Sequence, residues 1–346
     1  MATLAVKYRP SKFEDVCGQE SVITILNNQL EEKSFKNAYL FCGPSGCGKT
    51  TLARIFAKKL NNGGGSIIEV DAASNNGVDD VRTIIKDAQF LPIDGSYKIY
   101  ILDECHLFSN GAWNAMLKLI EEPPAKTIFI FCTTDPQKIP ATIIGRVQRY
   151  NFTKISDNQI VERLKHILET EKITTYDVPS LQLIARISKG GMRDSISTME
   201  KCLGFDTNLT VENITKALGI VGYEDMFSLL NSIVHKNTSD VIKKIDELYS
   251  NGVDIKIFIV NLIQFLLDIS RYLITNDFSV SYLPPSYKEK VDSIGLKKES
   301  VVELIEGLIK LNGCVKYESN PLVFFQSLPG KSHGRRSLVG CSPWRR

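Results

Sequence analysis

A glycine-rich segment near residue 45 constrains the fold of this chain more than any other feature. Residues 43–50 read Gly-Pro-Ser-Gly-Cys-Gly-Lys-Thr and match the pattern G-x-x-x-x-G-K-[S/T]. An apolar run at 37–42 precedes them, and an amphipathic stretch from Lys49 to about Leu60 follows. A strand, a glycine turn and a helix in this order direct backbone N–H groups and the positive end of a helix at a phosphate. The segment therefore predicts a parallel α/β sheet with a nucleotide site at the carboxyl ends of its strands.

The loop and a second, acidic motif predict how a nucleotide would be held and hydrolysed. Lys49 is expected to reach the β- and γ-phosphates, and the Thr50 hydroxyl is expected to ligate Mg²⁺. About fifty residues later an apolar strand ends in Asp103, which would hold Mg²⁺ through water, and Glu104, which would polarise the attacking water. Two acids after a strand can simply begin a loop, but behind a phosphate-binding loop they predict ATP hydrolysis. The expected nucleotide-binding residues of the loop are Gly43, Pro44, Ser45, Gly46, Cys47, Gly48, Lys49, Thr50 and Thr51.

The hydrophobic pattern predicts how the rest of the chain is organised. Helical patterns separate four apolar runs, as in a parallel sheet covered on both faces, and the runs lie at 37–42, 66–70, 97–102 and 127–132. After about residue 151 the pattern is helical throughout. One stretch, 254–274, is apolar almost all round, so it must be buried in a core or an assembly interface. The expected parts are an α/β domain over 1–153, a helical lid over 154–221, a helical domain over 222–327 and a disordered tail over 328–346.

Composition limits the remaining classes of function. The net charge is only +3, and four arginines fall in the last dozen residues, so any nucleic-acid site must be a local patch. The eight cysteines are scattered without a C-x-x-C pair, which predicts no zinc site. No apolar run is expected to reach the length of a membrane span, and the first residues show no secretion signal. A cytoplasmic location without a membrane partner is therefore expected.

Further segments carry a resemblance to a known family. They lie, with matching order, at 7–20, 71–74, 103–106, 117–124 and 133–138. On these segments the chain resembles the gamma/tau subunit of the bacterial DNA polymerase III clamp loader, an ATPase of the AAA+ class, from about Leu4 to Phe325. The resemblance implies an AAA+ P-loop ATPase domain, a small helical lid and an all-helical C-terminal collar. It implies ATP and Mg²⁺ as ligands. It also implies a ring with other clamp-loader subunits, pentameric in the family, and as further partners a sliding clamp, primer–template DNA and a replicative polymerase.

The resemblance also implies roles for residues outside the loop. Thr134 takes the position of a γ-phosphate sensor, and Arg193 that of a second sensor in the lid. Arg146 takes the position of an arginine finger acting on the neighbouring subunit's ATP, although the family triplet Ser-Arg-Cys is here Gly-Arg-Val. An arginine after such a loop is otherwise often a solvated surface residue. The adenine and ribose are expected to contact Tyr8, Arg9, Pro10 and Val16.

Two features concern DNA and zinc. Clamp loaders follow the DNA backbone with helix N-termini and basic side chains, and positions of that kind are Arg82, Asn114 and Lys118; each also fits a solvated helix face. Gamma/tau subunits usually carry a zinc knuckle between the loop helix and the second strand. Here that span is only Asn-Asn-Gly-Gly-Gly-Ser over 61–66, so the knuckle is missing.

Two other functions remain open at this stage. The chain could be another AAA+ ATPase of DNA metabolism, such as a branch-migration helicase or an initiation loader, but those helicases are expected to end in a winged-helix domain. No such pattern is visible over 223–325. It could also be a ring scaffold that lacks catalysis. Retention of the catalytic set argues against that reading: Lys49, Thr50, Asp103, Glu104, Thr134 and Arg146.

Overall fold

The computed structural model describes residues 3–315, and the chain divides into two compact units between Thr207 and Asn208. The first unit contains a five-stranded sheet in the order β2-β3-β4-β1-β5, with every pairing parallel. The strands are β1 Ala38–Cys42, β2 Ile67–Asp71, β3 Lys98–Asp103, β4 Thr127–Thr133 and β5 Gln148–Asn151. Because all strands run the same way, their carboxyl ends meet at one edge, where the loop after β1 and the two acids at the end of β3 come together.

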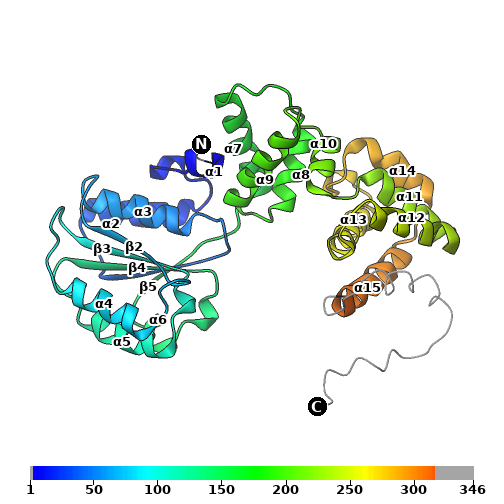
Figure 1. The fold of residues 1–346 in the computed structure, drawn as a ribbon. Coiled ribbons are helices and arrows are strands. Elements are labelled where there is room, and N and C mark those ends of the chain that lie inside the picture. Colours follow the sequence, from blue (N-terminus) through cyan, green and yellow to red (C-terminus); the bar gives the residue numbers. More distant parts are fainter. Residues whose placement is uncertain (1–2, 316–346) are drawn as a thin grey trace, which may run out of the picture. The chain divides into compact units, whose positions relative to one another are not determined.

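Helices cover both faces of the sheet (Figure 1). On one face lie α2 Glu20–Glu32 and α3 Lys49–Leu60, and on the other lie α4 Val78–Ala88, α5 Asn110–Glu121 and α6 Ala141–Ile144. Neighbouring residues of β1 point to opposite faces, so Tyr39 packs in the cluster with Phe56 of α3, and Leu40 packs in the cluster with Trp113 of α5. Burial on both faces explains why β1, β3 and β4 are apolar almost throughout.

Three helices complete the first unit: α7 Asp157–Thr170, α8 Val178–Ile187 and α9 Met192–Phe205. They pack against one another, and the short N-terminal helix α1 Leu4–Lys7 packs on α9. Side-chain caps set the starts of α7 and α8. Ser156 accepts a hydrogen bond from the Gln159 N–H at the start of α7, and Asp177 accepts one from the Ser180 N–H at the start of α8.

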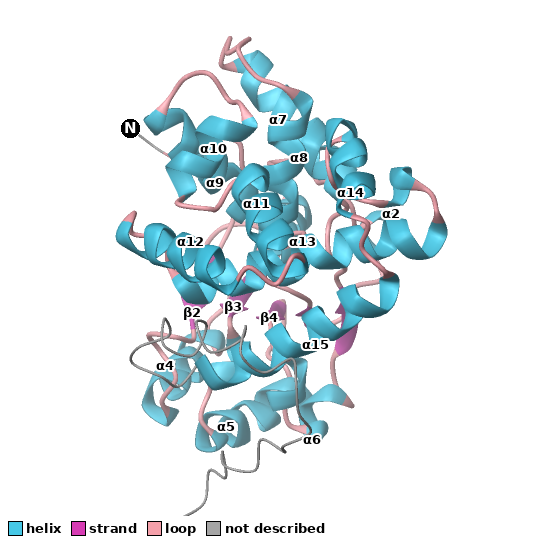
Figure 2. Cartoon of the chain, turned by 90° about the vertical axis from the view of Figure 1, so that its right-hand side faces the viewer, coloured by secondary structure: helices cyan, strands magenta, loops and turns pink. Residues whose placement is uncertain are grey.

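The second unit is helical over the described residues 208–315. It contains α10 Val211–Leu218, α11 Tyr223–Val234, α12 Thr238–Ser250, α13 Ile255–Thr275, α14 Lys288–Ile294 and α15 Lys298–Val315 (Figure 2). Its core forms around α13, which supplies Phe258, Leu262 and Phe265 to one buried cluster with residues of α11, α12 and α15.

The helix α13 corrects one expectation. With 21 residues, it is long and apolar enough to cross a membrane by length and composition, so the expectation that no apolar run reaches such a length is wrong. Its centre nevertheless belongs to the core of the helical unit, with Ile259 and Ile269 completely buried. The prediction that this stretch is buried in a core agrees with that face of the helix, whereas Ile257, Val260 and Ile274 are exposed.

The fold class is confirmed, with one strand added. The four predicted strands are β1 to β4, each within one or two residues of its expected limits. The edge strand β5 was not predicted because its sequence, Gln-Arg-Tyr-Asn, is polar and carries no strand pattern. The division after Thr207 differs from the expected lid boundary at 221, and the three-domain limits stay a prediction. The expected tail, 328–346, lies outside the described residues.

Candidate nucleotide site

The loop after β1 takes its shape from two positions whose backbone conformation favours glycine. Gly46 has a φ of 70° and Gly48, the N-cap of α3, a φ of 103°, both in the left-handed region. A Cβ on Gly46 would approach the Gly191 Cα to 3.0 Å, and the Gly46 carbonyl accepts a hydrogen bond of 3.0 Å from the Met192 N–H. The loop is therefore fixed both to α3, whose first turn it opens, and to the start of α9.

Lys49 lies inside this loop. The residue is 5% exposed, and its Nζ donates hydrogen bonds of 2.9 Å to the carbonyls of Gly43 and Pro44. These two residues do not line the cavity described below; the other predicted loop residues, 45–51, do. A buried ammonium held only by neutral carbonyls provides a positive centre that a phosphate can approach at little reorganisation cost.

Thr50 and Asp103 form the pair expected to hold Mg²⁺. The Thr50 hydroxyl donates a hydrogen bond of 2.8 Å to Asp103 Oδ2, and Asp103 Oδ1 accepts one of 3.0 Å from the Glu104 N–H. Burial raises the pKa of Asp103, while the Thr50 hydroxyl opposes this shift. A hydroxyl and a carboxylate are the hard oxygen donors that Mg²⁺ prefers, and neither is tied to a side chain outside the pair, so these residues fit the ion.

Glu104 turns towards Thr134. It has a φ of 46°, unusual for a residue with a side chain, and begins the short 3₁₀ helix Cys105–Leu107. Its Oε2 accepts hydrogen bonds from Thr134 Oγ1 at 2.8 Å and from the Thr134 N–H at 3.3 Å, and His106 Nδ1 lies 3.2 Å from the same oxygen. Thr134 does not line the cavity; the structure places it behind Glu104, which does.

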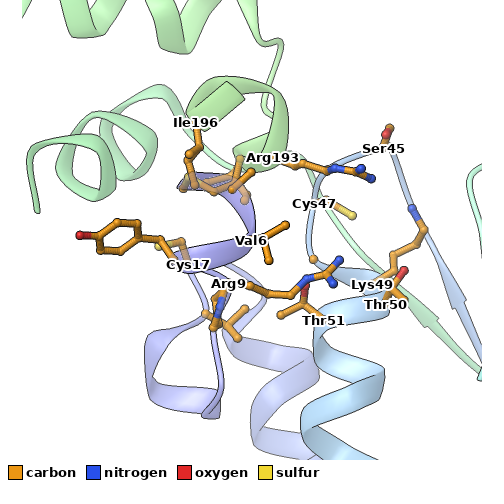
Figure 3. A pocket seen from close by; sticks show the side chains of 18 of the residues that line it. Val6, Arg9, Cys17, Ser45, Cys47, Lys49, Thr50, Thr51, Arg193 and Ile196 are labelled. Carbon is orange, nitrogen blue, oxygen red and sulfur yellow. The ribbon is translucent and has the colours of Figure 1, made fainter. Parts of the chain in front are cut away.

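A cavity of about 400 Å³ joins these residues to the N-terminal segment and the lid helices. The predicted nucleotide residues Tyr8, Arg9, Pro10 and Val16 line it, as do Asp103, Glu104 and Arg193. In Figure 3 the Arg193 side chain extends from the lid towards Ser45, and Arg9 extends towards Thr51. A pocket with apolar walls at one end and convergent charged groups at the other is suited to a base and its phosphates.

Sequence reasoning missed several lining residues. The missed residues are Val6, Cys17, Ile155, Arg163, Met192 and Ile196. Cys17 lies in the segment 7–20 and Met192 directly precedes Arg193, so a motif lay close to these two, whereas the other four have no such signal. Contacts with the lid explain how the N-terminal segment is placed. The Tyr8 hydroxyl donates a hydrogen bond of 2.5 Å to Glu171, Arg163 donates one of 3.1 Å to the Tyr8 carbonyl, and the Leu4 N–H donates one of 3.0 Å to Glu200.

The structure does not bring Arg146 to this cavity. Its Nη2 lies 2.6 Å from Glu121 Oε1, its Nη1 donates a hydrogen bond of 2.7 Å to the Thr142 carbonyl, and its side chain is 42% exposed. The candidate finger is thus held on the surface beside the end of α5. Its action on a neighbouring subunit stays a prediction.

The candidate DNA contacts lie on solvent-exposed faces of two adjacent helices. Arg82 on α4 pairs with Asp79 at 2.9 Å, and Asn114 and Lys118 are exposed on α5. None of them lines the cavity. Among residues 3–315 no group of three or more His, Cys, Asp or Glu side chains is placed to hold a metal ion, and a short loop over 61–66 joins α3 to β2.

Comparison with known proteins places this site in a family. Three sequence families match consecutive parts of the chain: "DNA polymerase III, delta subunit" over 65–156, "DNA polymerase III clamp loader subunit, ATPase lid domain" over 159–205 and "DNA polymerase III subunits gamma and tau domain III" over 209–301. The DNA polymerase III gamma subunit of Buchnera aphidicola is 32% identical over 77% of this chain and 80% of its own length. The chain belongs to the DNA polymerase III gamma/tau clamp-loader subunit family.

Other relatives are longer than this chain. The DNA polymerase III tau subunit of Bacillus subtilis is 37% identical over 92% of this chain but only 61% of its own length. The tau subunit of Escherichia coli is 35% identical over 76% of this chain and 44% of its own. The chain thus spans about half of these tau subunits, and what they do as whole proteins is not carried over with the family.

A solved structure supports the fold independently. The Holliday junction branch migration motor RuvB of Thermotoga maritima matches with a TM-score of 0.52 over 71% of this chain and 86% of that chain, at 19% identity. At this identity the likeness shows the shared AAA+ fold alone. The predicted family and fold class are confirmed.

Proposed function

We propose that this subunit binds and hydrolyses ATP and is a motor of a clamp loader that opens a sliding clamp and loads it on primed DNA. The observation that carries the proposal is the convergence of four groups on one cavity: the buried Lys49 in its loop, the pair of Thr50 and Asp103 at 2.8 Å, Glu104, and Arg193 from the lid. Each group has a distinct chemical task, and the family supplies the replication context.

The chain's own groups divide the work of phosphoryl transfer. The backbone N–H groups of the loop and the start of α3 bind the phosphates, and Lys49 leaves its two carbonyls to pair with the β- and γ-phosphates. Glu104 accepts the proton of the attacking water or orients that water. Thr50 and Asp103 would hold Mg²⁺, which supplies charge neutralisation on the phosphates. Arg193 links the γ-phosphate to α9, so the orientation of the lid helices depends on whether the bound nucleotide has a γ-phosphate.

Arg146 completes the site in a neighbouring subunit. In this chain it pairs with the exposed Glu121, so assembly would exchange that weak surface pair for the transferring phosphate of the next subunit. We propose a ring, pentameric as the family implies, with other clamp-loader subunits. We also propose the sliding clamp, primer–template DNA and the replicative polymerase as partners, and the cytoplasm as the location. DNA would run past Arg82, Asn114 and Lys118.

Steady-state ATP hydrolysis by the full chain tests this function. It is measured over protein concentrations that span assembly, with and without a sliding clamp and primed DNA. Stimulation by clamp and DNA that also rises with assembly is expected. Hydrolysis that is indifferent to the clamp would favour another AAA+ function, and a lack of hydrolysis at every concentration and with every partner would favour a ring scaffold.

A further inference from the structure

His106 is placed to control the orientation of Glu104, although neither the motif nor the family comparison assigns it a role. The two residues lie two positions apart in the order Asp103-Glu104-Cys105-His106, with Glu104 as the N-cap of the 3₁₀ helix and His106 within it. His106 Nδ1 lies 3.2 Å from Glu104 Oε2 and 3.2 Å from Thr133 Oγ1. Thr133 itself is completely buried and accepts a hydrogen bond of 3.0 Å from the Asp135 N–H. The imidazole is thus fixed from the core side by β4.

The network indicates which nitrogen of His106 carries a proton. A Glu carboxylate at neutral pH accepts hydrogen bonds and donates none. If Nδ1 were unprotonated, its lone pair would face the lone pairs of Glu104 Oε2 at 3.2 Å, which is repulsive. With the proton on Nδ1, the ring donates to Glu104 and lies close enough to share this bond with Thr133. The assignment with Nδ1 protonated is therefore the one that makes every contact favourable.

The same network limits what Thr134 can do. A threonine hydroxyl has one proton, and Thr134 donates it to Glu104 Oε2 at 2.8 Å. To donate to a γ-phosphate, as its predicted role requires, the Thr134 hydroxyl must break its hydrogen bond to Glu104 and rotate away from it. The carboxylate would then lose its shortest hydrogen bond at the step where its orientation matters. Its remaining side-chain partner is His106, which β4 holds in place independently of the nucleotide.

We propose that His106 is a positioning residue that donates from Nδ1 to Glu104 and keeps its carboxylate oriented when Thr134 turns to the γ-phosphate. The inference rests on the proposed hydrolysis of ATP. It also explains why Glu104 can keep a left-handed backbone conformation, since the carboxylate is fixed by groups in the segments that follow two neighbouring strands, β3 and β4. Partners that orient a reacting group in this way typically contribute about 10- to 100-fold to activity.

Turnover of variants tests the role. His106→Leu removes the donor, and His106→Asn keeps a polar N–H near the place of Nδ1. We expect His106→Leu to lower kcat about 10- to 100-fold with KM for ATP unchanged, and His106→Asn to restore most of the loss. His166→Leu, the same change at an exposed position of the lid, is the control and should leave kcat unchanged. Equal losses in both His106 variants, or no loss in His106→Leu, would overturn the proposal.

Coupling to Glu104 separates positioning from an independent effect. If His106 acts through Glu104, adding His106→Leu to Glu104→Gln should cause no further loss in single-turnover hydrolysis. A second loss of the same factor would mean that His106 acts elsewhere. Failure of the wild-type protein to hydrolyse ATP would sink the proposed function, and with it the catalytic consequence drawn here.

The tautomer provides a readout that does not depend on hydrolysis. The chain has only four histidines, so ¹⁵N correlation spectra of histidine-labelled protein can be assigned with His106→Asn and His166→Leu. We expect His106 to carry its proton on Nδ1 in the nucleotide-free protein. A proton on Nε2 alone would leave Nδ1 without one, and the contact with Glu104 would not be a hydrogen bond. That result would reject the proposal even if the protein hydrolyses ATP normally.

Discussion

The nucleotide unit and the helical unit differ in what their sequences must specify. In residues 3–207 several positions each require one particular residue type. They are occupied by glycines with positive φ, a buried lysine and two acids. In residues 208–315, the core around α13 requires only apolar side chains of suitable volume at helical spacing. Substitutions in the first unit should therefore remove chemistry and leave the fold, whereas core substitutions in the second should lower stability and leave ATP binding.

Arg146→Ala is expected to give the largest loss, and only in the assembled ring. An arginine finger contributes about 10³- to 10⁵-fold to turnover in nucleotide hydrolases. Because Arg146 lies outside the cavity of its own subunit, ATP affinity should not change. Turnover is compared in dilute and assembled protein, with Lys138→Ala, another exposed ion-paired residue, as the control. Equal loss in dilute monomer would show that the finger assignment is wrong.

Glu104→Gln should lower turnover about 10²- to 10⁴-fold and leave ATP binding intact. The amide can still accept a hydrogen bond from Thr134, so the local structure should persist, but it cannot take a proton from water. Single-turnover hydrolysis and ATP titration measure the two effects, with the exposed Glu122→Gln as the control. The role is refuted by a variant that still turns over at the wild-type rate.

Leu262→Ala tests the opposite half of the contrast. Leu262 is 1% exposed at the centre of α13, and truncation of such a side chain costs about 2–5 kcal/mol of stability. Denaturant unfolding should show this loss in the transition of the helical unit, while ATP affinity stays at the wild-type value. Val260→Ala on the same helix, at an exposed position, should cost much less. Loss of ATP binding by folded Leu262→Ala would contradict the separation of the two units.

Asp103→Asn should have the smallest of these effects, and it should raise the stability of the fold, whereas most substitutions lower it. Burial raises the pKa of Asp103 above 3.8, so the folded protein binds this proton more tightly than the unfolded chain. Stability therefore falls as pH rises from 3.8 through the raised pKa. The variant, which has no charge to bury, should show a higher Tm than the wild type at neutral pH, and the difference should shrink towards acid pH.

Thermal unfolding without nucleotide at neutral and acid pH measures this effect. For a unit of this size each kcal/mol corresponds to about 2–4 °C in Tm. Asp94→Asn, an exposed acid in the loop before β3, serves as the control with no expected pH-dependent difference. A lower Tm of Asp103→Asn at neutral pH would mean that the ionised carboxylate stabilises the fold, against the direction inferred from its burial.

The site was predictable where local sequence carries the chemistry. The loop 43–50 and the pair Asp103 and Glu104 depend on backbone conformation and on residues adjacent in the chain, and the structure brings loop residues 45–50 and both acids to one cavity. The edge strand β5 and the apolar lid residues that line the cavity, such as Ile155 and Ile196, were not predicted. Their side chains belong to no recognisable motif. They reach the site only because folding brings them close to residues that are distant in the sequence.

The sequence by itself determined that a parallel sheet holds a phosphate loop and two acids at one edge, because strand period and glycine conformation are local properties. Tertiary structure decided how those groups are oriented. It turned Glu104 onto Thr134 and His106, placed Lys49 on the carbonyls of its own loop, and kept Arg146 on the surface with Glu121. These contacts join residues from different strands and helices. Hydrogen-bond geometry between such elements depends on packing, which no local pattern specifies.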